Sequence, residues 1–405
     1  MPTIEFGFMD CMIAFTLAFI ITFSATPIAK RISMKAGAVD HPKDGRRMHK
    51  EPIARLGGIA IIAGFVVSVL FVFFTALLDS PEKDIVRQLL GIMAGMLIIS
   101  ATGIIDDIKK LGPWPKLTLQ IIAALVTILV SGLRITIFSN PFGASLPYIA
   151  VPAYISYPLT VLWIVAITNA INLIDGLDGL AAGVTAISCV SLFFINLFIN
   201  KDLSIMPFVS VLILALAGSS IGFLPFNFYP AKIIMGDTGA YFLGFMLGVI
   251  SIQGALKSYT VLSISVPLLV LGLPLMDTVV SIFRRIKTRK SIVLADRGHL
   301  HHRLIDMGLS TRQAVITLYI ASAGLGIAAI VMAERGVMSA VIFIIMVSLF
   351  VVTGAYYLRD INAVPPELIV KDEETAASEA ACESTQQTSG GEDGETEKKI
   401  SGREE

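Results

Sequence analysis

The sequence predicts an all-α polytopic membrane protein of about ten or eleven transmembrane helices. Of its 405 residues, 55% are hydrophobic and only 15% are charged, whereas a soluble domain carries about 25% charged residues. The mean hydropathy is +0.79. Apolar runs of roughly 17 to 23 residues recur along the chain, long enough to cross a hydrocarbon layer of about 30 Å as helices. Lipid offers the backbone no hydrogen-bond partners, so these runs must be helical.

The expected spans follow one another through most of the chain. The first comes after Glu5 and Asp10 rather than after a basic leader, which favours a retained helix over a cleaved signal peptide. The segment 134–155 is rich in β-branched and aromatic residues interrupted by Asn-Pro and Gly, and we predict a short external β-hairpin there. No internal repeat indicates the inverted halves common among transporters. In order, the spans lie near 8–26, 56–78, 88–105, 117–133, 156–172, 178–197, 205–224, 240–255, 260–282, 312–332 and 337–357.

Basic residues predict how the helices are oriented. The connections that alternate along the chain, beginning with 27–55, hold 19 Lys and Arg, whereas the other set holds 6. The positive-inside rule places the first set on the cytoplasmic face of the membrane. The amino terminus is then outside and the carboxyl terminus inside.

The chain divides by composition into a transmembrane domain, 1–360, and an acidic cytoplasmic tail, 361–405. From residue 371 onward there are eleven acidic residues and four basic ones. This part is rich in Glu, Ser, Thr and Gly and has little to bury, so the sequence predicts disorder. A solubilising role is the simpler interpretation of the tail, and regulation or partner binding is the alternative.

Carboxylates and amides gather at the ends of spans that face the predicted cytoplasmic side. Two adjacent acids, Asp106 and Asp107, close the third span, and Asp237 precedes the eighth in MGDTG. Polar groups inside membrane segments are expensive and usually functional. Solvated helix ends, or helix capping by Asp237, are the structural alternatives. Between the fifth and sixth spans, NAINLIDGLDGL supplies Asn169, Asn172, Asp175 and Asp178, for which capping is again the alternative.

Two loops of the same side carry basic residues and histidines. The segment GHLHHR supplies His299, His301, His302 and Arg303, which are suited to binding phosphates. Zinc is the rival ligand, but no cysteine lies near and neighbouring histidines rarely converge on one ion. In the first loop, Arg46 and His49 could attract an anionic headgroup or a nucleotide. Asp277 lies within an apolar run and could pair with Arg284 or Arg285.

These motifs resemble those of the bacterial polyprenyl-phosphate N-acetylhexosamine-1-phosphate transferases, relatives of phospho-N-acetylmuramoyl-pentapeptide transferase. The resemblance runs from about residue 10 to about residue 357. It comprises, in order, DHP…RRMH…P-x-A-R-L-GG, the aspartate pair, N-x-x-N-x-x-DG-x-DG, M-GDTG, PLMD and H-x-HHR. The H-x-HHR motif resembles that of members using UDP-N-acetylglucosamine (UDP-GlcNAc) or a similar UDP-sugar, whereas the muramoyl-pentapeptide branch has three consecutive histidines. Lys109 and Lys110 depart from members that have another acid after the aspartate pair.

The resemblance implies a helical bundle around a cytoplasmic catalytic cleft, a Mg²⁺ cofactor with Mn²⁺ as the alternative, and transfer of GlcNAc 1-phosphate from UDP-GlcNAc to undecaprenyl phosphate. The protein would then be surrounded by membrane lipids. A homodimer is one possible assembly, and no nucleic-acid partner is expected. The alternatives are another UDP-HexNAc or phospho-MurNAc-pentapeptide as donor, a secondary transporter and a non-catalytic scaffold. The implied catalytic residues are Asp106, Asp107 and Asp237; the metal ligands are Asp237, Asp107 and Asn172; the substrate-binding residues are Asn169, Asn172, Asp175, Asp178, His299, His301, His302, Arg303, Arg46 and His49.

Overall fold

The computed structural model describes residues 6–40, 52–79, 83–139, 148–200, 208–257, 265–288, 298–334 and 345. All of them belong to the first of the two units, Met1–Ser348 and Leu349–Glu405, into which the chain divides. The acidic tail, Arg46, His49 and, except for residue 345, the predicted span near 337–357 lie outside the described residues.

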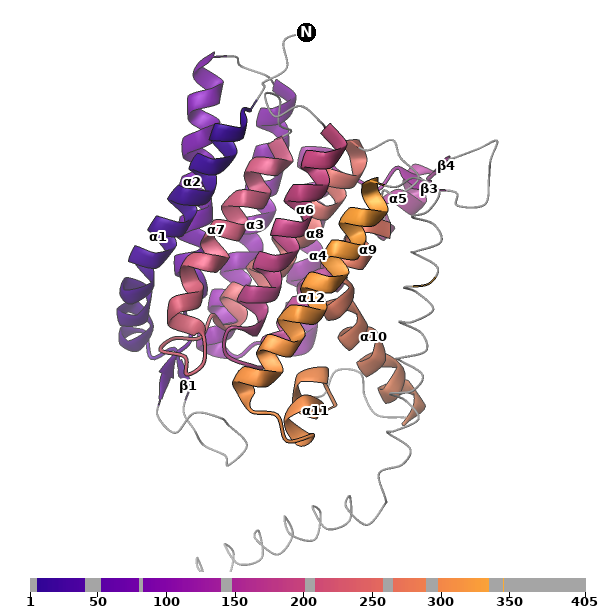
Figure 1. Ribbon diagram of the computed structural model, residues 1–405. Coiled ribbons are helices and arrows are strands. Elements are labelled where there is room, and N and C mark those ends of the chain that lie inside the picture. Colours follow the sequence, from indigo (N-terminus) through magenta and orange to yellow (C-terminus); the bar gives the residue numbers. More distant parts are fainter. Residues whose placement is uncertain are drawn as a thin grey trace, which may run out of the picture. The chain divides into compact units, whose positions relative to one another are not determined.

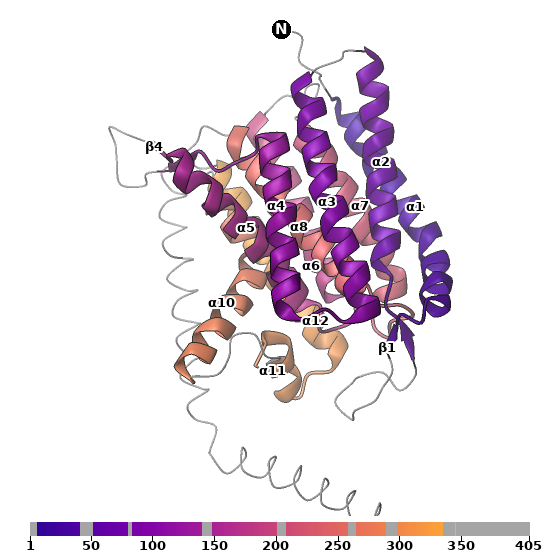
Figure 2. The same cartoon turned by 180° about the vertical axis from the view of Figure 1, so that it is seen from behind.

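The described part of the chain is helical nearly throughout (Figure 1, and from behind in Figure 2). Two short antiparallel strand pairs interrupt the helices: β1 (Val39–Asp40) with β2 (Ile53–Ala54), and β3 (Ile137–Ser139) with β4 (Tyr148–Ala150). The second pair confirms the hairpin predicted within 134–155. The helices are α1 (Phe8–Lys35), α2 (Gly58–Asp79), α3 (Lys83–Lys109), α4 (Pro113–Ser131), α5 (Ala153–Ile174), α6 (Leu180–Asn200), α7 (Phe208–Asn227), α8 (Gly236–Lys257), α9 (Ser265–Val270), α10 (Gly272–Lys287), α11 (Leu300–Asp306) and α12 (Thr311–Glu334).

Eight of the described helices, α1 to α7 and α12, are long and apolar enough to cross a membrane. Many of their large apolar side chains face outward; Leu129, for example, is 68% exposed. Exposed apolar stripes on long helices suit contact with lipid rather than water. The prediction of an all-α polytopic membrane protein is confirmed.

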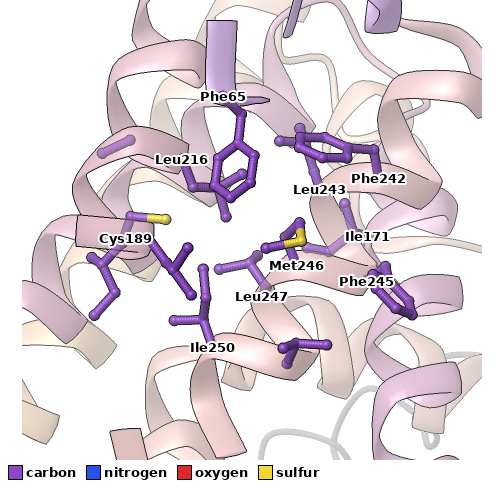
Figure 3. Close-up of a cluster of buried hydrophobic side chains, with 14 of the residues drawn as sticks. Phe65, Ile171, Cys189, Leu216, Phe242, Leu243, Phe245, Met246, Leu247 and Ile250 are labelled. Carbon is purple, nitrogen blue, oxygen red and sulfur yellow. The ribbon is translucent and has the colours of Figure 1, made fainter. Parts of the chain in front are cut away.

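Helix α8 forms the centre of the bundle. It packs against α2, α3, α5, α6 and α7, and its side chains from Ala240 to Ile252 are almost all buried. Figure 3 shows Phe242, Met246 and Ile250 of α8 among side chains of its neighbours, including Phe65 of α2 and Cys189 of α6. A helix that is apolar around its whole circumference is expected at such a central position.

The span predicted near 260–282 is divided in the structure. Its described part consists of α9 and α10, with Leu271 between them outside regular helical geometry (φ −92°, ψ 13°). Pro274 accounts for the interruption, because proline has no N–H to donate to the carbonyl of Val270. This break sets α10 apart from α9 as a separate helix.

The helices alternate in direction, so the connections predicted to be cytoplasmic share one end of the bundle. That end carries β1 and α11, whereas β3 and β4 lie at the opposite end (Figure 1). The end of α3, the start of α4, the end of α5 and the start of α8 therefore meet at the first of these ends. All the described candidate residues come from this end or from α11.

Candidate active site

Asp107, at the end of α3, caps the start of α8. Its Oδ1 accepts the backbone N–H of Asp237 at 3.0 Å, and its Oδ2 accepts the backbone N–H of Thr238 at 2.9 Å and the Thr238 hydroxyl at 2.6 Å. The first N–H groups of a helix have no partner within it, so this carboxylate satisfies two of them from another helix. Asp237 is consequently not needed as the cap of α8, and its own side chain is available for other contacts.

Glycine at position 236 permits this close approach. Gly236 has φ +68°, in the left-handed region, and a Cβ there would lie 2.2 Å from the carbonyl oxygen of Arg55. Neither the conformation nor the space suits another residue. The MGDTG motif therefore brings α8, the end of α3 and the segment containing Arg55 together.

Arg55 is placed by a buried serine at the end of α1. The Ser33 hydroxyl accepts the backbone N–H groups of Arg55 and Leu56 at 3.0 and 3.2 Å. The guanidinium of Arg55 then lies 3.3 Å from Asp107 Oδ1 and 3.7 Å from Asp237 Oδ2. A third carboxylate, that of Asp40, lies 3.7 Å away. Arg55 is thus the shared cation of carboxylates from three separate segments.

Lys116, in the first turn of α4, connects Asp106 with Asp237. Its Nζ lies 2.5 Å from Asp106 Oδ2 and 3.9 Å from Asp237 Oδ2. Asp106 also accepts the Tyr241 hydroxyl at 3.1 Å and the backbone N–H of Leu111 at 2.8 Å. The Asp106 carboxylate is therefore held by α4, α8 and the turn between α3 and α4.

Asp237 is more open than Asp106 and Asp107. Its side chain is 22% exposed, against 1% for Asp106 and 0% for Asp107. The Asn172 amide donates to its Oδ1 at 2.9 Å, so α5 also contributes to the site. Asp175 follows at the end of α5, where burial and the charges of Asp237 and Asp107 raise its pKa well above the usual value.

The site holds more negative than positive charge. Five carboxylates, those of Asp40, Asp106, Asp107, Asp175 and Asp237, interact with two cations, Arg55 and Lys116. Within the described ranges no three His, Cys, Asp or Glu side chains form a complete metal-binding group. Mg²⁺, however, usually takes only one or two carboxylates from the protein and completes its shell with water and substrate phosphates. The donor set and the surplus negative charge fit such a cation.

Asn169 lies one turn before Asn172 on α5 and pairs with Gln120, a residue that the sequence analysis did not select. Its amide donates to Gln120 Oε1 at 2.6 Å and to the Val165 carbonyl at 2.8 Å, and its Oδ1 lies 3.4 Å from Gln120 Nε2. Both amide hydrogens are therefore used. Gln120 is one turn from Lys116 on α4, so the pair fixes the spacing of the helices that carry Lys116 and Asn172.

Replacing Gln120 by leucine should loosen this spacing. Asn169 would lose a buried partner, so we expect the free energy of unfolding to fall by about 1–3 kcal/mol. Misplacement of Lys116 and Asn172 should lower turnover about tenfold. Denaturant unfolding and initial rates in detergent measure the two effects. Thr118→Ala, at an exposed position of the same helix, is the control; equal behaviour of both variants would contradict the role of the pair.

Asp178 supports the loop between α7 and α8. Its Oδ2 accepts the backbone N–H of Ala231 at 2.9 Å. One residue later, the backbone N–H of Gly179 donates to Asn227 Oδ1 at 3.1 Å, and the Gly179 carbonyl accepts the Tyr319 hydroxyl at 2.6 Å. The DGLDG segment is thereby joined to α7 and α12.

Helix α11 brings the histidines beside the same segment. His301 is only 2% exposed, and a Cβ added to Gly176 would lie 2.4 Å from its Nε2. The rings of His299 and His301 are parallel, with centroids 5.8 Å apart, and the His302 ring lies 4.3 Å from that of His301. Arg303 lies in the last turn of α11. The H-x-HHR motif is therefore next to Asp175 and Gly176, although it is more than 120 residues away in sequence.

Burial lowers the pKa of His301 to about 4 from 6.5. The ring is then neutral at pH 7 and can offer a hydrogen bond but no charge. In the unfolded chain it binds a proton at a higher pH, so protein stability should fall as the pH drops from about 6.5 to about 4. We expect the unfolding temperature of His301→Gln to fall less over this pH range than that of the wild type. Parallel plots of unfolding temperature against pH would contradict this.

The structure thus brings together the predicted residues Asp106, Asp107, Asn172, Asp175 and Asp237, and sets the α11 histidines beside them. It places Asn169 and Asp178 in supporting contacts. Sequence reasoning missed Lys116, Gln120, Tyr241 and Ser33. The spacing of Lys116 and Gln120, four residues apart at the start of an apolar helix, is the signal that could have indicated the first two.

Fold and site together define a multi-pass membrane protein with an ionisable site at one end of its bundle. A family model described as glycosyl transferase family 4 matches residues 89–255. A Bacillus subtilis protein named "Probable undecaprenyl-phosphate N-acetylglucosaminyl 1-phosphate transferase" is 39% identical over 84% of this chain and 89% of its own length. A Mycolicibacterium smegmatis decaprenyl-phosphate N-acetylglucosaminephosphotransferase is 34% identical over 75% of this chain and 77% of its own length.

A third relative matches a smaller part of the chain. The phospho-N-acetylmuramoyl-pentapeptide-transferase of Streptococcus thermophilus is 32% identical over 60% of this chain and 71% of its own length. The chain belongs to glycosyl transferase family 4.

Proposed function

We propose that the protein transfers N-acetylglucosamine 1-phosphate from UDP-GlcNAc to undecaprenyl phosphate, releasing UMP and forming undecaprenyl-diphospho-GlcNAc. The observation that supports this most strongly is the convergence of Asp106, Asp107, Asp175 and Asp237 on Arg55 and Lys116. It occurs in a chain whose Bacillus subtilis relative is named for this reaction. Such a product would begin a cell-envelope glycan.

The reaction exchanges one phosphoric anhydride for another. A phosphate oxygen of the lipid attacks the β-phosphorus of the donor, and the bond between that phosphorus and the oxygen bridging to the α-phosphate breaks. UMP leaves with the bridging oxygen. Two anions must therefore be brought together and aligned, and fixed cations next to the reacting groups lower the cost.

Arg55 and Lys116 provide these cations. Each lies near the open carboxylate of Asp237 while a buried carboxylate, Asp107 or Asp106, holds it in place. A guanidinium and an ammonium fixed in this way can donate hydrogen bonds to phosphate oxygens without reorganising. Asp106, held by Lys116 and Tyr241, is the residue we assign to positioning or deprotonating the lipid phosphate.

A divalent cation fits the same site. We propose that Asp237, with Asn172 and Asp175 beside it, holds Mg²⁺, and Mn²⁺ is the alternative. When bound, the ion neutralises the diphosphate of the donor and polarises it. Asp107, expected from the sequence as a further ligand, already accepts three hydrogen bonds at the start of α8. Its main contribution in this proposal is to orient Asp237 and Arg55.

The remaining side chains would bind the donor. We assign the nucleotide to the segment from Asn169 to Asp178, and the sugar phosphates to His299, His301, His302 and Arg303. Arg46 and His49 would attract the anionic substrates from the first loop. Asn169 and Asp178 act in this proposal chiefly by holding that segment, because their hydrogen bonds join it to α4 and to the α7–α8 loop.

A lipid-transfer assay tests this function. Purified full-length protein is incubated with undecaprenyl phosphate and UDP-sugars labelled in the sugar, and label is counted in the butanol-extractable lipid. We expect transfer from UDP-GlcNAc, loss of transfer with EDTA, and recovery with Mg²⁺. Preference for another UDP-HexNAc would change the donor assignment, and no lipid label from any donor would contradict the function.

We also propose that the site faces the cytoplasm of the bacterial plasma membrane, with the amino terminus outside. The excess of Lys and Arg in the connections at the site's end supports this orientation. Single cysteines can be introduced near Asp237 and near the β3–β4 pair and exposed to an impermeant maleimide in intact cells. We expect the cysteine near the β3–β4 pair to be labelled and the cysteine near Asp237 to remain unlabelled. Labelling near Asp237 from outside would contradict the orientation.

A further inference from the structure

Helix α10 holds the start of α11 through a buried carboxylate. Asp277 is only 6% exposed. Its Oδ2 lies 2.9 Å from His299 Nδ1, and its Oδ1 accepts the backbone N–H of Leu300 at 2.7 Å. Leu300 is the first residue of α11, so this N–H has no acceptor within the helix. One carboxylate thus caps α11 and orients the first histidine of the motif.

A second residue on the same side of α10 reaches the same segment. Arg284, seven residues after Asp277, donates from Nη1 to the Gly298 carbonyl at 2.5 Å. Residues seven apart lie on one face of a helix. Three consecutive residues, Gly298, His299 and Leu300, are therefore bound by α10.

The other side of α11 is fixed by close packing. The buried Nε2 of His301 has no hydrogen-bond partner among the described residues and lies against Gly176, where a Cβ would come within 2.4 Å of it. The histidine helix is therefore located between α10, which holds its start, and the segment that follows Asp175. A shift of α11 would move its rings relative to Asp175 and Asp237.

We propose that Asp277 is a positioning residue for the donor: with Arg284 it seats α11, and through His299 Nδ1 it fixes which ring nitrogen faces the site. This deepens the proposed function and rests on it for the effect on donor binding. Asp277 is acceptor-only when ionised, so His299 must carry its proton on Nδ1. The Nε2 atom of His299 then points away from Asp277, and the contact with Asp277 fixes both its direction and its lack of a proton.

Asparagine at position 277 reverses this arrangement. Its Oδ1 can still accept the Leu300 N–H, but its amide nitrogen then faces His299 and can only donate. The His299 ring must then accept this hydrogen bond at an unprotonated Nδ1, so its proton moves to Nε2. Histidine-selective ¹⁵N NMR of the full-length protein in detergent reads this change directly, with His299→Gln assigning the signals.

Asp277→Asn should raise the KM for UDP-GlcNAc about 10- to 100-fold, the range found when a residue that orients a metal-bound histidine is replaced, while the KM for undecaprenyl phosphate stays the same. Thr278→Ala is the matched control, because the Thr278 hydroxyl donates to the Pro274 carbonyl of its own helix, and the change should leave both KM values unchanged.

A second pair of variants tests the contact between Asp277 and the start of α11 if Asp277→Asn does not fold. Leu300→Pro removes the N–H that Asp277 accepts, and proline is tolerated at the first position of a helix. His299, with φ −65° and ψ 151°, already has a conformation suited to the residue before proline. Leu300→Ala removes the same side chain but keeps the N–H. We expect the proline variant to show the larger rise in donor KM.

The proposal would be overturned by an unchanged His299 tautomer in Asp277→Asn, or by equal donor KM values for Leu300→Pro and Leu300→Ala. Equal rises in the two KM values of Asp277→Asn would also oppose it, because they would indicate general distortion. If the wild type transfers no sugar phosphate at all, the proposed function fails instead, and the tautomer measurement still decides whether Asp277 seats α11.

Discussion

Asp237→Asn is expected to lower UMP release by about 10³-fold or more, the range found when a group that stabilises charge in a transition state is removed. The carboxylate of Asp237 is the open member of the cluster and faces Arg55, Lys116 and Asn172. Asparagine has the same shape and can still accept the Asn172 hydrogen bond. It cannot supply the charge that a cation and the two basic side chains require.

This variant should fold like the wild type, because the start of α8 is capped by Asp107 rather than by Asp237. Initial rates of UMP release, measured beside thermal unfolding in the same detergent, separate chemistry from folding. Activity within about threefold of the wild type would remove Asp237 from the reaction, since that corresponds to well under 1.4 kcal/mol.

Asp106→Asn is expected to have the second-largest effect, a loss of about 10²-fold or more in turnover. Asp106 Oδ2 accepts from both Lys116 and Tyr241. If the asparagine oxygen keeps the Leu111 N–H, its amide nitrogen faces an ammonium group that has no lone pair to offer. Lys116 would then lose its fixed position, and the lipid phosphate would lose the residue we assign to it.

Asp10→Asn provides the comparison for this variant. Asp10 is an acid in the first turn of α1, at the other end of that helix from Ser33, and it accepts the Gly7 N–H at 2.8 Å. It should lose little activity, because it lies far from the cluster. Similar losses in the two variants would indicate that any lost carboxylate disturbs the bundle, and would argue against a specific role for Asp106.

The fold was largely predictable because membrane helices follow from local composition. Each apolar run must satisfy its own backbone, so the spans and the 134–155 hairpin could be located without knowing their neighbours. The break at Leu271 was missed, although Pro274 lay within the predicted span. Proline in a membrane helix is often tolerated, and only the neighbouring helices decide whether the chain continues through it.

The sequence indicated which residues form the site better than it indicated what each of them does. Asp106, Asp107 and Asp237 could be placed on one face by alternating the spans. That Asp107 caps α8 could not be seen, because its partners are 130 residues away. Asp277 likewise bonds to His299 and Leu300, which follow more than 20 residues later in the chain. Such partners depend on how helices pack, which helical periodicity alone does not specify.

The central claim is that the sugar moves together with the β-phosphate of the donor. UDP-GlcNAc carrying ³²P only in the β-phosphate, incubated with undecaprenyl phosphate and the full-length protein, tests it directly. We predict that the label enters the lipid fraction and that the released UMP is unlabelled. Label remaining in a water-soluble UDP, with the sugar in the lipid, would show transfer of the sugar alone and would contradict the account.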